Sequence, residues 1–211
     1  MKWIKKFLKI IGLVLLAVII VYMSILRSFL MHWGSTKDER NKFYPGDSIV
    51  IDPKTKTTIA VTINEPPSSI WPWVAQMGLN KGGFYSYTWL ENIFGCKLHN
   101  ADAIHPEWQN VNQGDIEPVC DAAAKKNMPG WIVAVLIQNK AFVYKINSDS
   151  SWTMGYYIDS MDAGHSRLIT RMRYSAPQTL GEFISEKAWL EWAHCIMQRG
   201  SIKGIKRRSE Q

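Results

Sequence analysis

The stretch that most constrains the fold of this chain lies at residues 63–78 and reads I-N-E-P-P-S-S-I-W-P-W-V-A-Q-M-G. Residues 57–63 lead into it with alternating side chains, many of them β-branched, which predicts a half-buried strand. The Pro-Pro pair ends that strand, because proline cannot donate a ladder hydrogen bond. A helix then begins at a Ser69 cap, with Pro72 in its first turn, or it begins earlier and Pro72 lies inside it. A generic strand-to-helix corner would give the same pattern.

The middle of the chain predicts several strands, and its C-terminal part predicts one long helix. The expected strands are residues 116–119, 131–137, 141–146, 152–158 and 166–174. Short turns between successive strands favour an antiparallel meander over parallel βαβ units. Residues 180–199 are expected to form the longest helix. In its second half, one narrow polar stripe lies on an otherwise apolar surface and consists of Lys187, Glu191, His194 and Gln198. The predicted fold class is therefore α+β, with a second short helix expected at residues 84–94.

In the last expected strand, residues 166–174, the arginines and apolar residues do not segregate cleanly, because Ile169 shares the odd positions with the arginines. Arg167, Arg171 and Arg173 occupy odd positions, and the even positions carry Leu, Thr, Met and Tyr. Because neighbouring side chains point to opposite faces of a sheet, we expect the odd face to be the solvent face.

Several motifs resemble those of one protein superfamily. Besides residues 63–78, they are G-F-Y-S-Y-T-W-L-E-N at 83–92, A-D-A-I-H-P-E-W-Q at 101–109 and a basic G-I-K-R-R at 204–208. From about His32 onward the chain resembles the SRPBCC superfamily, the helix-grip fold of START-like lipid carriers, plant pathogenesis-related allergens and polyketide cyclases. More narrowly, it resembles a membrane-anchored bacterial branch of unknown function. The resemblance implies a curved antiparallel sheet around a long C-terminal helix, with two short helices near its start.

The N-terminus has the pattern of an anchor. Four lysines within residues 2–9 precede an apolar run from Ile10 to Leu26, which breaks at Arg27. Such a run is typical of a transmembrane helix, which needs about 17 to 25 residues, and a cleaved signal peptide is the alternative. The lysines favour the cytoplasmic side, so we expect a single-pass membrane protein with a cytoplasmic N-terminus and an exported domain.

The expected division of the chain follows from these patterns. It comprises a basic segment and anchor at 1–31, a linker at 32–56, the helix-grip domain at 57–199 and a basic tail at 200–211. The net charge is +7, but residues 28–198 carry −2, because the basic residues gather at both ends. This distribution argues against nucleic-acid binding, which requires a basic face on the domain itself. It suits chain ends lying near anionic lipid head groups.

Residues 99–115 contain the densest group of ionisable side chains. His99, Asp102, His105 and Glu107 are the residue types that acid–base catalysis or a metal site would use. Their spacing fits no metal motif, and a structural loop is the alternative. A cyclase- or hydrolase-like enzyme of this fold would use this group.

No cofactor or metal is expected. Cys96, Cys120 and Cys195 are widely spaced and form no C-x-x-C pair, which argues against a zinc ribbon. One disulfide and three free thiols both remain open. The chain also lacks the Cys-and-His cluster of the iron–sulfur oxygenases that share the fold.

The main functional hypothesis is binding of a lipid or other hydrophobic small molecule in an internal cavity between sheet and long helix, next to the membrane. The residues expected to line this cavity are Trp71, Trp73, Met77, Phe84, Tyr85, Tyr87, Trp108, Trp189, Trp192 and Ile196. The alternatives are the enzyme described above and an interaction protein with a closed core. The sequence does not predict the oligomeric state.

Overall fold

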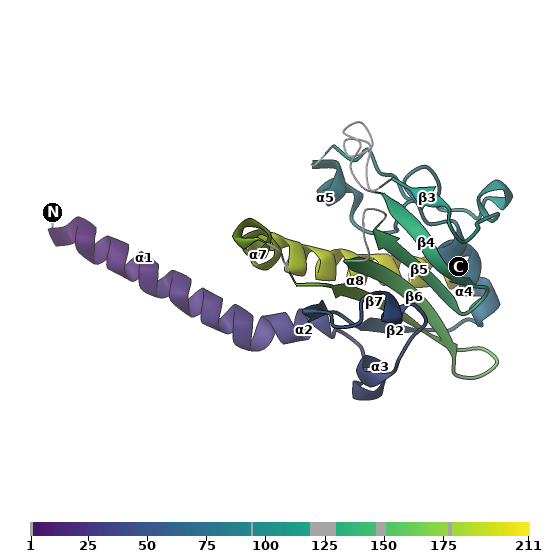
Figure 1. The fold of residues 1–211 in the computed structure, drawn as a ribbon, viewed down its shortest axis with the longest axis horizontal. Helices are drawn as coiled ribbons and strands as arrows, with labels where there is room; N and C mark the ends of the chain where they lie inside the picture. Colours follow the sequence, from purple (N-terminus) through teal and green to yellow (C-terminus); the bar gives the residue numbers. More distant parts are fainter. Residues whose placement is uncertain (1, 94, 119–129, 147–150, 177–178) are drawn as a thin grey trace.

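The computed structural model describes residues 2–93, 95–118, 130–146, 151–176 and 179–211, which form one antiparallel sheet with a long C-terminal helix (Figure 1). The strands are β1 (Thr55–Lys56), β2 (Ile59–Ile63), β3 (Ile116–Glu117), β4 (Trp131–Ile137), β5 (Ala141–Ile146), β6 (Trp152–Ser160) and β7 (Ser166–Tyr174). Their order is β1-β7-β6-β5-β4-β3, and β2 also pairs with β7. The predicted α+β class with an antiparallel sheet and a C-terminal helix is confirmed, and the arrangement is consistent with a helix-grip fold.

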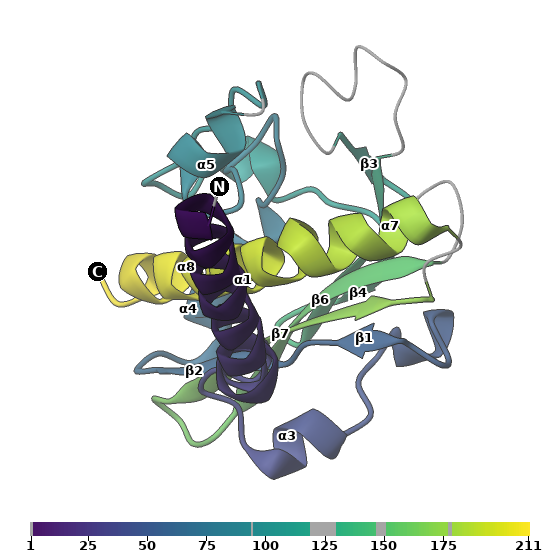
Figure 2. The same ribbon diagram turned by 90° about the vertical axis from the view of Figure 1, so that its left-hand side faces the viewer.

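The helices connect and cover this sheet. They are α1 (Lys2–Val21), α2 (Arg27–Met31), α3 (Lys37–Asn41), α4 (Pro67–Ala75), α5 (Thr88–Ile93), α7 (Leu180–Ser185) and α8 (Glu191–Ser209). Single π-helical turns join α1 to α2 and α7 to α8. Helix α4 begins before Ser69 and contains Pro72, so the earlier of the two expected starts is the observed one. Figure 2 shows α8 lying across one face of the sheet.

Side-chain alternation gives the sheet two different faces. Even-numbered residues of β6 and β7, such as Met154, Tyr156 and Met172, join the larger hydrophobic core under α8. Odd-numbered residues, such as Tyr157 and Ile169, join a smaller core on the opposite side. We call these the inner face and the outer face.

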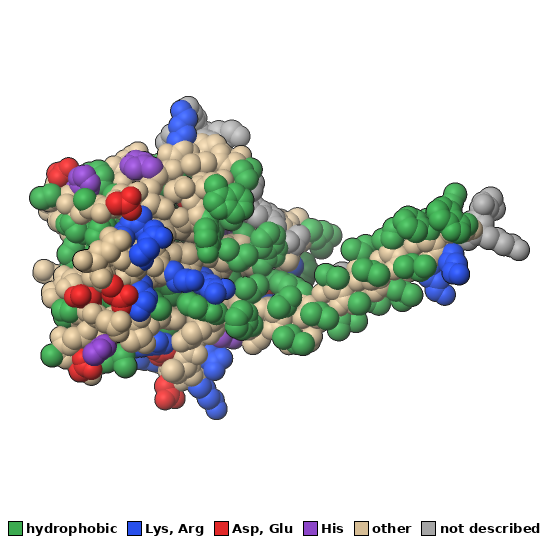
Figure 3. Space-filling model, turned by 180° about the vertical axis from the view of Figure 1, so that it is seen from behind, with side chains coloured by type: hydrophobic (Ala, Val, Ile, Leu, Met, Phe, Trp, Pro, Cys, Tyr) green, Lys and Arg blue, Asp and Glu red, His purple; other side chains and the backbone are tan. Residues whose placement is uncertain are grey.

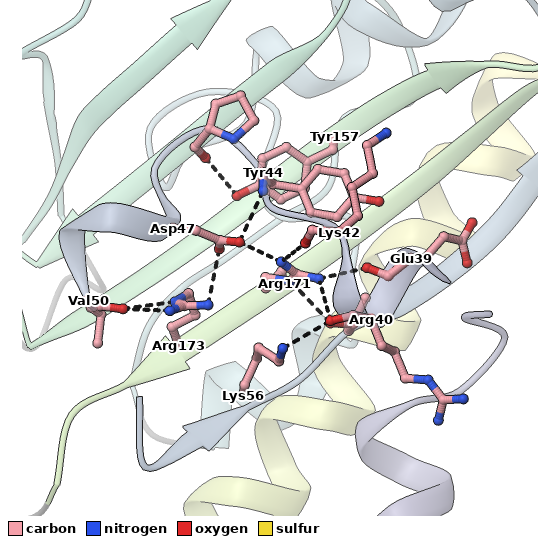
Figure 4. Close-up of polar contacts among 12 residues, drawn as sticks. Glu39, Arg40, Lys42, Tyr44, Asp47, Val50, Lys56, Tyr157, Arg171 and Arg173 are labelled. Carbon is pink, nitrogen blue, oxygen red and sulfur yellow. Dashed lines mark hydrogen bonds and ion pairs between the residues drawn. The ribbon is translucent and has the colours of Figure 1, made fainter. Parts of the chain in front are cut away.

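The outer face is covered, so our prediction that the odd-numbered arginines of β7 face solvent is wrong. Residues 37–51, which we call the strap, lie across this face (Figure 4). Arg171 is only 1% exposed and donates to the Asp47 carboxylate at 2.6 Å and to three backbone carbonyls of the strap. The segment expected to be a linker, residues 32–56, therefore packs back onto the sheet and satisfies the guanidinium donors.

Residues 200–211, expected to form a tail, continue α8 almost to the C-terminus. Gly204 permits this packing, because a Cβ there would collide with the carbonyl oxygen of Tyr85. Arg208 is buried and donates from Nε to the Ala101 carbonyl at 2.7 Å. The basic residues at the chain end are thus partly structural.

Our prediction of a transmembrane anchor and an exported domain is wrong, because no helix in the described part of the chain has the length and apolar character that a bilayer crossing requires. Figure 3 shows α1 projecting from the rest of the molecule with hydrophobic side chains on its surface. Beyond it, Arg27 contacts Glu191 of α8 at 2.6 Å.

Candidate functional site

A cavity of about 160 Å³ lies between the inner face of the sheet and α8. Its lining is Phe84, Ser86, Glu91, Trp131, Ile146, Trp152, Met154, Tyr156, Met172, His194, Met197, Gln198 and Ser201. These residues come from β4 to β7, from α8, and from α5 with the segment before it. For scale, an engineered apolar cavity of about 150 Å³ accepts benzene. The hollow is therefore large enough for one aromatic ring.

The walls of the cavity are mainly aromatic and sulfur-containing. Trp131 and Trp152 meet edge to face, with ring centroids 5.3 Å apart. Met154, Met172 and Met197 complete the apolar lining. Because methionine is flexible and polarisable, it adapts to irregular apolar ligands and packs well on aromatic rings. The chemistry of the walls therefore suits a flat or compact hydrophobic molecule.

Glu91 brings a carboxyl group to the edge of this apolar space. The residue is 8% exposed, and its Oε2 atom is buried with no hydrogen-bond partner. Burial disfavours the charged form and raises the pKa of Glu91 to about 7. A carboxyl group in this state exists in both protonation forms near neutral pH and can accept or donate a hydrogen bond.

His194 contributes a second titratable group, from α8. Its Nδ1 lies 3.0 Å from the Tyr174 hydroxyl, and its ring lies 4.9 Å from the ring of Trp152. Burial lowers the pKa of His194 to about 4, so the imidazole is neutral at pH 7. With a neutral imidazole, the positive charge of a histidine is absent from the cavity near neutral pH.

The hydroxyl and amide side chains of the lining are paired within the protein. The Tyr156 hydroxyl lies 3.0 Å from Ser201 Oγ. Gln198 accepts from the Thr57 hydroxyl at 2.9 Å and donates to Thr170. These bonds link α8 to β6, to β7 and to Thr57 between β1 and β2, and they fix the helix over the sheet.

Phe84 is the residue among our ten expected ligand-binding positions that the structure places in the lining. Trp71, Trp73, Met77 and Tyr85 belong to the inner core. The Trp73 and Tyr85 rings meet edge to face at 5.9 Å, and the Tyr85 hydroxyl accepts a hydrogen bond from Gln76. The aromatic motif at the strand-to-helix corner therefore packs the fold beside the cavity.

The other expected positions lie further out. Tyr87 is 40% exposed, and Ile196 is partly buried in α8. The Trp108 ring is tilted against that of His105, with ring centroids 4.0 Å apart. Trp192 borders an open groove between α8 and α1. The Trp189 side chain and Cys120 lie outside what the structure describes.

The expected polar group is divided into two surface pairs. His105 Nδ1 lies 3.3 Å from Glu107, and the two side chains are 38% and 64% exposed. Asp102 is 84% exposed and accepts from Arg208 at 2.6 Å. His99 is exposed as well. In the described residues, no group of three or more His, Cys, Asp or Glu side chains could hold a metal ion.

Sequence reasoning missed Glu91 and most of the cavity wall. The wall could have been found by following side-chain alternation along residues 152–156, whose even positions face α8. Glu91 gave a weaker signal, as one carboxyl inside the short apolar stretch W-L-E-N-I. His194 falls on the polar stripe of the long helix, so the sequence pattern alone does not distinguish it from a solvent-facing residue.

Comparisons with known proteins returned structural neighbours only. No family model matches the chain, and no curated protein matches its sequence. The protein XoxI from Bacillus cereus is 8% identical, covers 72% of this chain and 94% of its own, and has a TM-score of 0.44. A protein from Thermobifida fusca is 8% identical, with coverages of 73% and 92% and a TM-score of 0.45. A Polyketide_cyc-like protein from Corynebacterium glutamicum is 16% identical, with coverages of 72% and 85% and a TM-score of 0.36.

Proposed function

We propose that the cavity between the inner face and α8 binds a hydrophobic small molecule of about the size of one aromatic ring. The observation that carries this proposal is the hollow of about 160 Å³ with aromatic and methionine walls. A packed interior leaves few voids larger than a water molecule, because dispersion contacts are lost around each void. An apolar ligand that fills the space would restore these contacts.

The size of the hollow also bears on the ligand class. Pockets for drug-sized ligands measure about 300 to 1,000 Å³. A whole lipid would therefore require Phe84 or Met197 to move, whereas a ring or a short branched chain fits the walls as they stand. Membership of the SRPBCC superfamily is part of this proposal, and the sequence motifs together with the sheet-and-helix arrangement support it.

Calorimetric titration with toluene tests the proposal. Ligand-efficiency limits for small molecules lead us to expect a dissociation constant on the order of 0.1 to 1 mM for the full chain. Ile146→Phe, on the cavity wall, should fill the space and weaken binding at least tenfold. Ile137→Phe makes the same change at a position of β4 that is 41% exposed, and it should leave binding unchanged.

The proposal fails if toluene does not bind, or if both variants bind it as the natural chain does. A cyclase- or hydrolase-like activity at His99, Asp102, His105 and Glu107 stays a separate prediction, because those side chains lie at the surface rather than in the cavity lining.

A further inference from the structure

Some polar side chains around the cavity have hydrogen-bond partners within the protein, and others do not. Ser86 donates to the Met197 carbonyl at 3.0 Å, and the side chains of Gln198 and Ser201 have the partners given above. The indole N–H of Trp152 also lacks a partner of good geometry, and its ring lies 4.7 Å from that of Tyr174. The buried Oε2 atom of the Glu91 carboxyl group receives no hydrogen bond. An acceptor is therefore left for a ligand to satisfy.

Near neutral pH, the charge that the described lining can place in the cavity is negative. The titratable groups of its described lining are Glu91 on α5, Tyr156 on β6 and His194 on α8, and no Lys, Arg or Asp belongs to that lining. His194 is neutral near pH 7 because burial lowers its pKa to about 4. A carboxylate ligand would meet Glu91 with no counter-charge in the cavity, and like charges at close range repel.

The walls add a second preference for positive charge. Phe84, Trp131, Trp152 and Tyr156 present aromatic rings to the same space. The negative face of an aromatic ring attracts cations, and it does so most strongly when the cation is removed from water. A cationic group between these rings and Glu91 would gain from both contacts.

We propose that the ligand is a small hydrophobic amine whose ammonium group pairs with the Glu91 carboxylate while its apolar part packs on the aromatic walls. This inference rests on the proposed function and names its ligand class. An ammonium supplies three donors and a full positive charge. Glu91 can provide both an acceptor and a negative charge, and no other lining side chain described here does so near neutral pH.

Three probes with the same ring test the proposal on the full chain: toluene, benzylamine and benzoate, titrated at pH 8 and pH 6. At pH 8 we expect benzylamine to bind at least tenfold more tightly than toluene, and benzoate not to bind. Alkylamines stay protonated over this range, whereas Glu91, whose pKa is about 7, takes up a proton as the pH falls. Benzylamine affinity should therefore fall about tenfold from pH 8 to pH 6, and toluene affinity should stay constant.

Glu91→Gln keeps the shape of the side chain and removes its charge. We expect this variant to lose both the preference for benzylamine over toluene and the pH dependence of benzylamine binding. Glu107→Gln makes the same change at a residue whose side chain is 64% exposed, and it should change neither.

The amine proposal is overturned if toluene binds while benzylamine gains nothing over it, if benzoate binds equally well, or if the preference persists in Glu91→Gln. If no probe binds, the cavity function itself fails and the amine proposal falls with it. Toluene binding thus distinguishes failure of the amine proposal from failure of the cavity function. It also reports that each variant is folded.

Discussion

Buried ionisable groups lie on both sides of the sheet, but they differ in whether the protein supplies their partners. On the outer face, Arg171 is as buried as a core residue, yet the strap provides a carboxylate and three carbonyls for its guanidinium. Its guanidinium carbon also lies 4.6 Å from the centre of the Tyr44 ring. On the side of the inner face, Glu91 of α5 borders the cavity, is 8% exposed and has one oxygen without a hydrogen-bond partner.

This difference separates a structural site from a binding site. Asp47 Oδ1 on the outer face also lacks a hydrogen bond, but this carboxylate is paired with the guanidinium groups of Arg171 and Arg173. Breaking a buried charge that has a counter-charge costs stability. An unpaired carboxyl beside a hollow costs stability in the free protein and gains a partner when a ligand arrives. The inner face therefore has the features of a binding site. The contacts on the outer face are structural, because they hold the strap against the sheet.

Removing the anion of the outer face should have the largest effect. Asp47→Ala leaves Arg171 buried without its carboxylate, so we expect a loss of about 3 to 5 kcal/mol in the free energy of unfolding, measured with denaturant. Lys42→Ala is the control on the strap. It breaks the exposed pair with Asp159 and should cost less than about 1 kcal/mol. Equal losses would contradict the structural role of the buried cluster.

The inner face should respond to pH through Glu91. Its pKa is raised from 4.5 to about 7 on folding, so the folded state binds the extra proton. The stability that Glu91 contributes is therefore complete below about pH 4.5 and is lost as the pH rises through about 7. The difference corresponds to on the order of 3 kcal/mol.

Glu91→Gln removes this dependence, whereas His194 titrates in both proteins and cancels from the comparison. We expect the variant to gain stability relative to the natural chain between pH 5 and pH 8, as measured by unfolding curves at each pH. A constant difference between the two proteins over this range would contradict the buried, unpaired carboxyl.

A smaller loss should follow from breaking one hydrogen bond at the base of the cavity. Ser201→Ala removes the partner 3.0 Å from the buried Tyr156 hydroxyl, and we expect a cost of about 1 kcal/mol. Ser160→Ala removes an exposed hydroxyl on the same strand as Tyr156 and should change stability by less than about 0.5 kcal/mol. Indistinguishable thermal transitions would show that this bond does not support α8.

The smallest effect is expected at the surface loop. Replacing both His105 and Glu107 by alanine removes a pair whose side chains are 38% and 64% exposed. We expect toluene affinity to change by less than about twofold and stability by less than about 0.5 kcal/mol. Loss of toluene binding in this variant would connect the loop to the cavity and favour the enzyme hypothesis.

The sequence predicted local structure well where alternation and turn residues act together. The strands at 131–137, 141–146 and 166–174 have the expected bounds, because their patterns and turns agree. The prediction for Arg171 failed because a strand pattern identifies a face but not what covers it, and the strap lies more than 100 residues away in the chain. The helix beginning at 180 runs on to Ser209, and in this extension Ile202 and Ile205 are buried in the core while Gly200 and Gly204 pack closely against Tyr87 and Tyr85.

The candidate site was harder to predict for a related reason. A cavity is defined by the volume that many distant side chains fail to fill, and no local pattern records that volume. Aromatic residues such as Trp73 and Tyr85 carry the same sequence signal whether they line a hollow or fill a core. Glu91 becomes notable only once its burial and its missing partner are known.

The most direct measurement of the central claim is a crystal structure of the full chain under xenon pressure. Xenon enters dry apolar cavities of this size. We predict one bound xenon atom on the inner face between Trp131, Trp152 and Met197, and none on the outer face under the strap. A cavity found filled by Phe84 or Met197, with no xenon in it, would contradict the account.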